Sequence, residues 1–472
     1  MRDQMSGRRS RVRPIRSSRV TRPVALTSRR TGLVVAPILI LVWALTVIRP
    51  VSHNAQLFGL LSILFGASVY QMVARRRQPF PVPSAGFGAL LFVGAGACLY
   101  GALRHNPGAS FLVLPYVFGP LLYFLIAQTI TWRHIEMAVR ALPWITIVLS
   151  VGIILTALGE RGSHVPVLST VFGYFDFGSG VNARGGNVEV RFYGLSSLLA
   201  LVPMMGTMLH GRKELGLTKA NRYVAYAAYA LGLLATFLTG RRMLQILVIA
   251  GPAISYFAVR YGVGASRKRA KIGRNIFRYA LGLVGALMVA GAFGLRVSTL
   301  VRLLSFNGGK SDDISIRVNQ TKALLGHWAR QPFFGAGAGA VLDDFVRDPI
   351  RPWNFEAQYP LLLFQGGLFG AWLWISGMRA IFRASKQALA KREKRMRHIF
   401  AMSVTGSVAM IVANGTNPYL QAVGHHWALF APALVAGAAR RHVVSQSALE
   451  QRPQPAWSRA GREARRKLAT AS

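Results

Sequence analysis

The sequence predicts an all-α, polytopic membrane protein of about 12 transmembrane helices with a large, partly helical outer loop. Hydrophobic residues make up 52% of the 472 residues, charged residues only 15%, and the mean hydropathy is +0.35. The apolar residues gather in runs of about 20, the length that a helix needs to cross a bilayer. In lipid these runs must be helical, because a helix satisfies its own backbone hydrogen bonds.

The expected spans follow one another along most of the chain. They cover residues 31–49, 55–74, 84–103, 109–130, 141–158, 192–210, 223–240, 242–262, 279–295, 356–378, 399–415 and 418–438. The first run is longer than the apolar part of a cleaved signal peptide and has no small-residue cleavage site before further spans. We therefore expect it to remain in the protein as a signal anchor.

Charge assigns the two sides of the membrane. Residues 1–30 carry ten arginines and one acid, and the basic connectors "RRRQPFP", "GRKELGLTKANR", "SRKRAKIGR" and "KREKRMR" fall on the same side if the spans alternate. Because positive loops stay in the cytoplasm, both termini are expected there. The chain then divides into a basic cytoplasmic tail (1–30), a transmembrane domain (31–438) and a second basic cytoplasmic tail (439–472), expected to be disordered.

The strongly basic balance points to lipid rather than nucleic acid. The 57 Lys and Arg residues outnumber 15 acids and give a net charge of +42. This charge is spread over many short inner loops, which favours anionic membrane lipids as partners and argues against nucleic acid. The single cysteine, Cys98, excludes an intramolecular disulfide. No metal-ligand spacing or nucleotide-binding loop occurs, so neither a metal nor a cofactor is expected.

Two outer connectors, 159–191 and 296–355, are long, whereas the others are short turns. Nine of the fifteen acids lie on this outer side. Long connectors in a compact protein usually have a function. Chemistry or recognition is therefore expected at the outer face.

The second long connector contains a predicted helix. Ser311 or Asp312 can cap its start, where acids suit the positive end of the helix, and Pro332 ends it. Arg317 and Leu324 then share one face with two further residues. Beyond the proline, "FFGAGAGA" allows two interpretations: a tight turn packed against a helix, or backbone N–H groups presented to phosphate. The glycines concerned are Gly335, Gly337 and Gly339.

Four stretches, in order and at sensible spacing, carry a family resemblance: "VRFYGLSSLLALVPMM", "TGRRMLQILV", "IRVNQTKALLGHWARQPFFGAGAGA" and "FEAQYPLLLFQGGLFGAW". They resemble the signature stretches of the O-antigen ligase and polymerase family over about residues 188–380. That family comprises bacterial inner-membrane glycosyltransferases that use polyprenyl-diphosphate-linked sugars. The resemblance implies such a glycan donor, and a glycan or lipid-linked acceptor, for this chain.

The resemblance also implies site residues. Arg242 falls on the arginine of the family's Thr-Gly-Ser-Arg-Gly stretch and Arg241 on its serine, while Arg317 and Arg191 match two further outer-face arginines. The ligases have a His-Asn pair where this chain has Glu356 and Ala357. This departure favours a polysaccharide polymerase over a ligase.

The chemistry of these residues can be argued without the family. A lipid diphosphate carries several negative charges, and guanidinium groups bind phosphate oxygens through two parallel hydrogen bonds. Arg242 and Arg317 are thus candidate catalytic residues, and Arg191 and Arg241 candidate substrate-binding residues. Glu356 is a candidate general base. The simpler alternatives are arginines that extend to lipid headgroups and an acid that suits a helix start.

The sequence also offers further candidate site residues and two alternative functions. Gln358 and Tyr359, next to Glu356, are further candidate substrate-binding residues, while His425 and His426 in the last span are hydrogen-bonded core residues or a site. A peptidoglycan polymerase of the shape, elongation, division and sporulation family is an alternative enzyme. The non-enzyme alternative is a flippase or exporter of lipid-linked sugars, which should show two similar halves.

Overall fold

The chain is described by a computed structural model. It describes residues 39–48, 55–74, 84–159, 180–184, 187–191, 193–239, 241–264, 312–346, 348–415 and 417–450. The expected span 279–295 and the expected tail at 1–30 lie outside these residues, as do most of the tail 439–472 and residues 31–38 of the first span.

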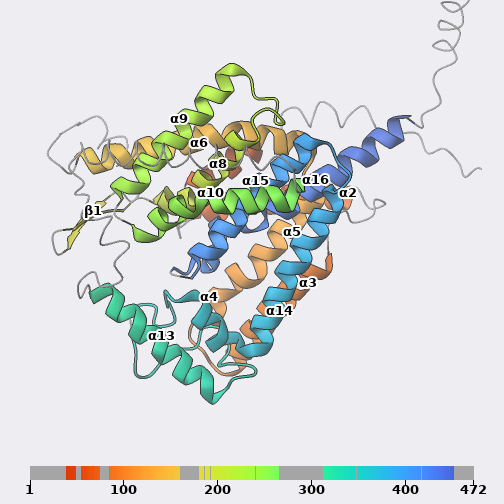
Figure 1. Cartoon of the computed structure of the whole chain (residues 1–472). Coiled ribbons are helices and arrows are strands. Elements are labelled where there is room, and N and C mark those ends of the chain that lie inside the picture. Colours follow the sequence, from red (N-terminus) through yellow and green to blue (C-terminus); the bar gives the residue numbers. More distant parts are fainter. Residues whose placement is uncertain are drawn as a thin grey trace, which may run out of the picture.

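Helices dominate the described residues (Figure 1). A helix at Leu39–Ile48 precedes those labelled in the figure. The labelled helices are α2 (Ala55–Ala74), α3 (Ser84–Leu103), α4 (Ala109–Val113), α5 (Gly119–Thr129), α6 (Trp132–Gly159), α8 (Leu198–His210), α9 (Lys219–Leu238), α10 (Arg242–Val263), α13 (Asp312–Arg330), α14 (Gln358–Leu389), α15 (Lys394–Ala413) and α16 (His426–Glu450). Short helical turns are η1 (Leu114–Phe118), η2 (Tyr193–Ser197), η3 (Tyr419–Gln421) and η4 (Val423–His425).

Six helical segments within the described residues are long and apolar enough to cross a membrane, which indicates a multi-pass helical membrane protein. They are Ser84–Leu103, Ala109–Thr129, Trp132–Ala157, Met243–Val263, Gln358–Leu389 and Lys394–Ala413. The expected 12 spans are thus not confirmed. The apolar helices Leu39–Ile48, Gly59–Val73 and Gly194–His210 are too short by the same measure.

The expected last span, 418–438, is not one continuous helix. Residues 419–425 form the two short turns η3 and η4, and α16 begins only at His426. The side chain of Asn414 accepts a hydrogen bond from the N–H of Leu420 at 2.9 Å, and a ring nitrogen of His426 lies 3.0 Å from the carbonyl oxygen of Leu420. These side chains satisfy backbone groups that a helix would satisfy itself, so the turns are stable inside the protein.

A β-hairpin is the exception to the all-α expectation. Strand β1 (Gly180–Arg184) pairs antiparallel with β2 (Asn187–Arg191), with Gly180 opposite Arg191. The sequence places Gly185-Gly186 between them, and a two-residue glycine turn suits the twist of a hairpin. Part of the first long connector therefore has regular structure.

Helix α14 is interrupted at Gly367, whose φ of 64° and ψ of −170° are not helical. The carbonyl oxygens of Phe364 and Gln365, before the break, accept hydrogen bonds from the N–H groups of Ala336 and Gly337. After the break, the N–H groups of α14 donate to the carbonyl oxygens of residues 332 and 333. The glycine-rich loop, residues 332–340, thus supplies the hydrogen bonds that the broken helix lacks.

Helix α13 packs against the start of α14 and forms a small core of its own with the loop that joins them. Its buried members include Leu324, Leu342, Phe355 and Leu361. In Figure 1, α13 lies beside the end of α14 at which that helix begins, away from α6 and α9. This small core positions the face of α13 that carries Arg317 beside the beginning of α14.

Candidate functional site

Arg317 and Glu356 form an ion pair at the junction of α13 and α14. The Nε atom of Arg317 donates a hydrogen bond to Oε2 of Glu356 at 2.6 Å. The Arg317 side chain is 42% exposed and the Glu356 side chain 22% exposed, so both remain accessible. This contact brings together two of the three candidate catalytic residues.

Gln320 supports this pair from the buried side of α13. Its side chain is fully buried, and its Oε1 atom accepts hydrogen bonds from the N–H groups of Glu356 at 3.2 Å and Ala357 at 3.4 Å. Arg317 and Gln320 are three residues apart, so they lie side by side on one face of α13, and both contact Glu356. Gln320 holds the backbone that carries the carboxylate, a role that the sequence analysis missed.

Arg241 lies in the three-residue connection between α9 and α10. Its N–H donates to Oγ1 of the buried Thr239 at 3.3 Å. Helix α10 begins at the next residue, so the positive end of its dipole adds to the arginine charge. Arg242 starts α10, and its side chain lies outside the described part of the structure.

Tyr419, in η3, lies near these charged groups, and sequence reasoning missed it. Burial raises the pKa of its hydroxyl to about 12, while the charges of Arg241 and Arg317 act in the opposite direction and Glu356 adds to the increase. The two arginines and the carboxylate are therefore all close enough to Tyr419 to act on it. Four segments that are far apart in the sequence converge here.

The glycine-rich loop is a packing element. Gly335, Gly337 and Gly339 have φ values of 69°, 86° and 73°, which side chains rarely adopt. A Cβ atom at Gly339 would lie 2.1 Å from the backbone of Gly108. The N–H groups of Gly335 and Gly337 donate to the carbonyl oxygens of residues 331 and 365. These two groups are engaged within the protein, which favours the tight-turn interpretation over phosphate binding.

The remaining candidate substrate-binding residues are Gln358, Tyr359 and Arg191. Gln358 is fully buried at the start of α14, and the Tyr359 hydroxyl donates to the carbonyl oxygen of Ile411 in α15. Tyr359 therefore joins α14 to α15 in this structure. Arg191 ends strand β2, and its side chain lies outside the described part.

His425 and His426 are core residues with hydrogen bonds. They lie just before α16 and at its first residue, not at the middle of a span. Nε2 of His425 is 2.6 Å from Oγ of Ser196, and both side chains are buried. His426 holds the carbonyl oxygen of Leu420, as described above. These contacts match the interpretation of hydrogen-bonded imidazoles.

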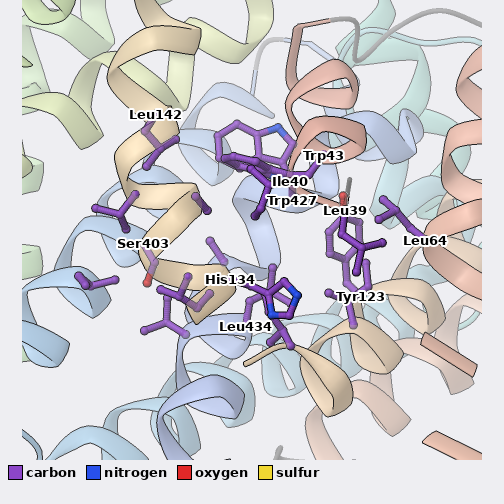
Figure 2. Close-up of a pocket in the computed structure, with 18 of the residues that line it drawn as sticks. Leu39, Ile40, Trp43, Leu64, Tyr123, His134, Leu142, Ser403, Trp427 and Leu434 are labelled. Carbon is purple, nitrogen blue, oxygen red and sulfur yellow. The ribbon is translucent and has the colours of Figure 1, made fainter. Parts of the chain in front are cut away.

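A separate cavity of about 130 Å³ lies among the helices (Figure 2). Trp43, Tyr123 and Trp427 contribute to its largely apolar wall, and His134 and Ser403 are among its few polar side chains. None of the charged residues of the Arg317–Glu356 region lines it. The cavity is thus distinct from the candidate site.

The candidate site combines three kinds of group. Guanidinium groups bind anionic oxygens, a carboxylate can accept a proton, and a protonated tyrosine donates a hydrogen bond. The arrangement therefore suits a phosphate-containing ligand next to a group that loses a proton. Comparison of the chain with known proteins found no matching family model and no matching curated protein.

Proposed function

We propose that the protein is a membrane glycosyltransferase that takes glycan from a polyprenyl-diphosphate donor at the outer face of the bacterial cytoplasmic membrane. Its acceptor is a glycan or a lipid-linked glycan, and the product is a polysaccharide. The observation that carries the proposal is the contact between Arg317 and Glu356, with Nε and Oε2 2.6 Å apart. It supports an anion-binding group and a base within one site.

The proposed reaction uses each group in turn. The guanidinium of Arg317 bonds to Glu356 through Nε, so its two terminal amino groups can bind the donor's diphosphate as a fork. Arg241 adds a second positive charge, and Arg242 is proposed to do the same. The Glu356 carboxylate accepts the proton of the acceptor hydroxyl, whose oxygen bonds to the anomeric carbon. The bond to the diphosphate breaks, and the lipid diphosphate leaves with its electrons.

Most of the acceleration is expected from positioning and charge stabilisation, because diphosphate is already a good leaving group. A positioned base contributes roughly 10²- to 10⁴-fold. A polymerase is preferred to a ligase because Glu356 and Ala357 stand where the ligases resembled have His and Asn. The outer face is preferred because the site lies at the expected outer ends of α10 and α14.

The direct test is reconstitution of the purified protein with a polyprenyl-diphosphate-linked oligosaccharide. Mass spectrometry of the lipid-linked products should show oligosaccharides longer by whole repeat units. Arg317→Ala and Arg241→Ala should abolish elongation, because each removes a cation from the diphosphate site. A matched control is Arg330→Ala, which removes an exposed arginine at the far end of α13.

The same assay separates the alternatives. A flippase or exporter would move the donor across sealed vesicles without forming a glycosidic bond. A peptidoglycan polymerase would elongate only a donor that carries the peptidoglycan disaccharide. Transport without new bonds, or elongation unchanged in both arginine variants, would overturn the proposal.

A further inference from the structure

Tyr419 lies in a segment that two polar side chains hold in place. The segment joins α15 to α16 and contains the turns η3 and η4. Asn414 uses both ends of its amide: Oδ1 accepts from the N–H of Leu420 and Nδ2 donates to the carbonyl oxygen of Met410, each at 2.9 Å. His426 contacts the carbonyl oxygen of Leu420 from the other side. The backbone next to Tyr419 is therefore fixed.

The ring of Tyr419 is fixed as well. It meets the ring of His425 edge to face, with centroids 5.0 Å apart and an interplanar angle of 62°. His425 is itself held by Ser196, whose Oγ lies 2.6 Å from Nε2 of the imidazole. A donor group held this firmly loses little conformational freedom when it binds a ligand.

The segment also lies beside the start of α14. A Cβ atom at Gly415 would lie 3.5 Å from the ring of Tyr359, and the Tyr359 hydroxyl donates to the carbonyl oxygen of Ile411. The end of α15 therefore contacts the first turn of α14, which follows Glu356 directly. This packing explains why Arg317 and Glu356 act electrostatically on Tyr419.

The Tyr419 hydroxyl is a hydrogen-bond donor at neutral pH. Burial raises its pKa to about 12, so it keeps its proton throughout the physiological range. It lies outside the six candidate spans, within the influence of Arg241 and Arg317, which reach the site from different parts of the chain. A neutral O–H donor in a region that also contains two cations favours an oxyanion as the ligand.

We infer that Tyr419 is a third donor to the diphosphate that Arg241 and Arg317 bind, and that its hydroxyl contacts a phosphate oxygen directly. This inference rests on the proposed function, because it assumes a diphosphate at that site. The two arginines supply positive charge, whereas Tyr419 supplies a hydrogen-bond donor whose orientation is fixed. Such a donor orients the leaving group relative to Glu356 without adding charge to a partly buried site.

The test measures binding of inorganic pyrophosphate to the full-length protein in lipid nanodiscs by isothermal titration calorimetry. Tyr419→Phe keeps the ring against His425 and removes only the hydroxyl. It should weaken pyrophosphate binding by about 10-fold, the effect of one hydrogen bond to a charged group. The matched control is Tyr123→Phe, which removes a hydroxyl from the cavity wall and should bind pyrophosphate like the wild type.

A second replacement guards against a purely structural effect. Fluorotyrosine at position 419 has a more acidic phenol and is a stronger donor, so pyrophosphate binding should become tighter than with tyrosine. A tyrosine that only fills space would not respond in this direction. Thermal unfolding of each variant confirms that the protein is folded.

The outcomes separate the inference from the proposed function. If Arg241→Ala and Arg317→Ala weaken pyrophosphate binding but Tyr419→Phe does not, the inference is wrong and the diphosphate site stands. If the wild type does not bind pyrophosphate, or the arginine variants bind it equally well, both are wrong. Weakening in all three variants, with the Tyr123→Phe control unchanged, supports both.

Discussion

The Nε atom of Arg317 lies 2.6 Å from Oε2 of Glu356, although the two residues are 39 positions apart in the sequence. Both side chains are partly exposed, and ion pairs of this kind stabilise a protein by only about 0.2–1 kcal/mol. The fold therefore gains little from the contact. This small contribution to stability agrees with the catalytic role that we propose for the pair at the start of α14.

Glu356→Gln should reduce product formation by roughly 10²- to 10⁴-fold, because the amide keeps the shape of the side chain but cannot accept a proton. The measurement is the initial rate of elongation in reconstituted vesicles, normalised to the amount of protein. Pyrophosphate binding should persist, and the free energy of unfolding should change by no more than about 1 kcal/mol. Wild-type rates in this variant would exclude general base catalysis by Glu356 and leave charge stabilisation as the mechanism.

Arg317→Lys should lose most of the activity even though the positive charge remains. An ammonium group cannot form the two parallel hydrogen bonds that a guanidinium forms with phosphate oxygens. The elongation rate should fall toward that of Arg317→Ala, with a raised KM for the donor. Arg330→Lys, at the exposed end of α13, is the control and should retain full activity. Full activity in Arg317→Lys would show that charge alone suffices.

Gly367→Ala should destabilise the protein, whereas Gly366→Ala should not. A Cβ atom at Gly367 would lie 2.2 Å from the carbonyl oxygen of Phe333, and the positive φ adds about 1–3 kcal/mol of strain. At Gly366 a Cβ atom meets nothing within 4 Å. The thermal unfolding midpoints of the two variants in detergent give the comparison. Equal midpoints would mean that the break in α14 is not a tightly packed feature.

The expected orientation can be tested with an impermeant thiol reagent in intact spheroplasts, in a Cys98→Ala background. Ile350→Cys, in the outer connector at a position that is 84% exposed, should react from outside. Lys391→Cys, in the basic connector between α14 and α15, should react only after the membrane is permeabilised. Reaction of Lys391→Cys in intact spheroplasts would reverse the assigned topology.

Local signals in the sequence are sufficient to predict the bounds of α13. The acids at its start and Pro332 beyond its end bracket the observed helix, Asp312–Arg330, closely. The expected shared face is also present, with Leu324 buried against α14 and Arg317 beside Glu356. Capping and proline effects act within one turn of a helix, so they can be read from neighbouring residues.

Neighbouring residues in the sequence do not identify Tyr419 as a site residue. Average hydropathy assigns residues 418–438 to a span, but two single hydrogen-bonding side chains, Asn414 and His426, stabilise turns at its beginning. Averages over a window do not register such contacts. The role of Gln320 was missed for a related reason, since its partners Glu356 and Ala357 belong to a different segment.

The hairpin, in contrast, has a signal in the sequence that differs from the apolar runs of the spans. The stretch "GVNARGGNVEVR" places Gly-Gly between two short segments, the second of which alternates valine with polar residues. Apolar runs alone identify this region only as a connector. A period-two pattern within a long outer connector is therefore informative even in a helical membrane protein.

The break at Gly367 has a consequence for biosynthesis. The backbone partners of α14 at the break are residues 332–337, which the ribosome makes before α14 itself. In the proposed topology these residues must cross the membrane before the helix that follows can complete its hydrogen bonds. Export of the outer connector thus becomes a prerequisite for maturation of the helix, and a chain stalled before export would retain unpaired peptide groups at membrane depth.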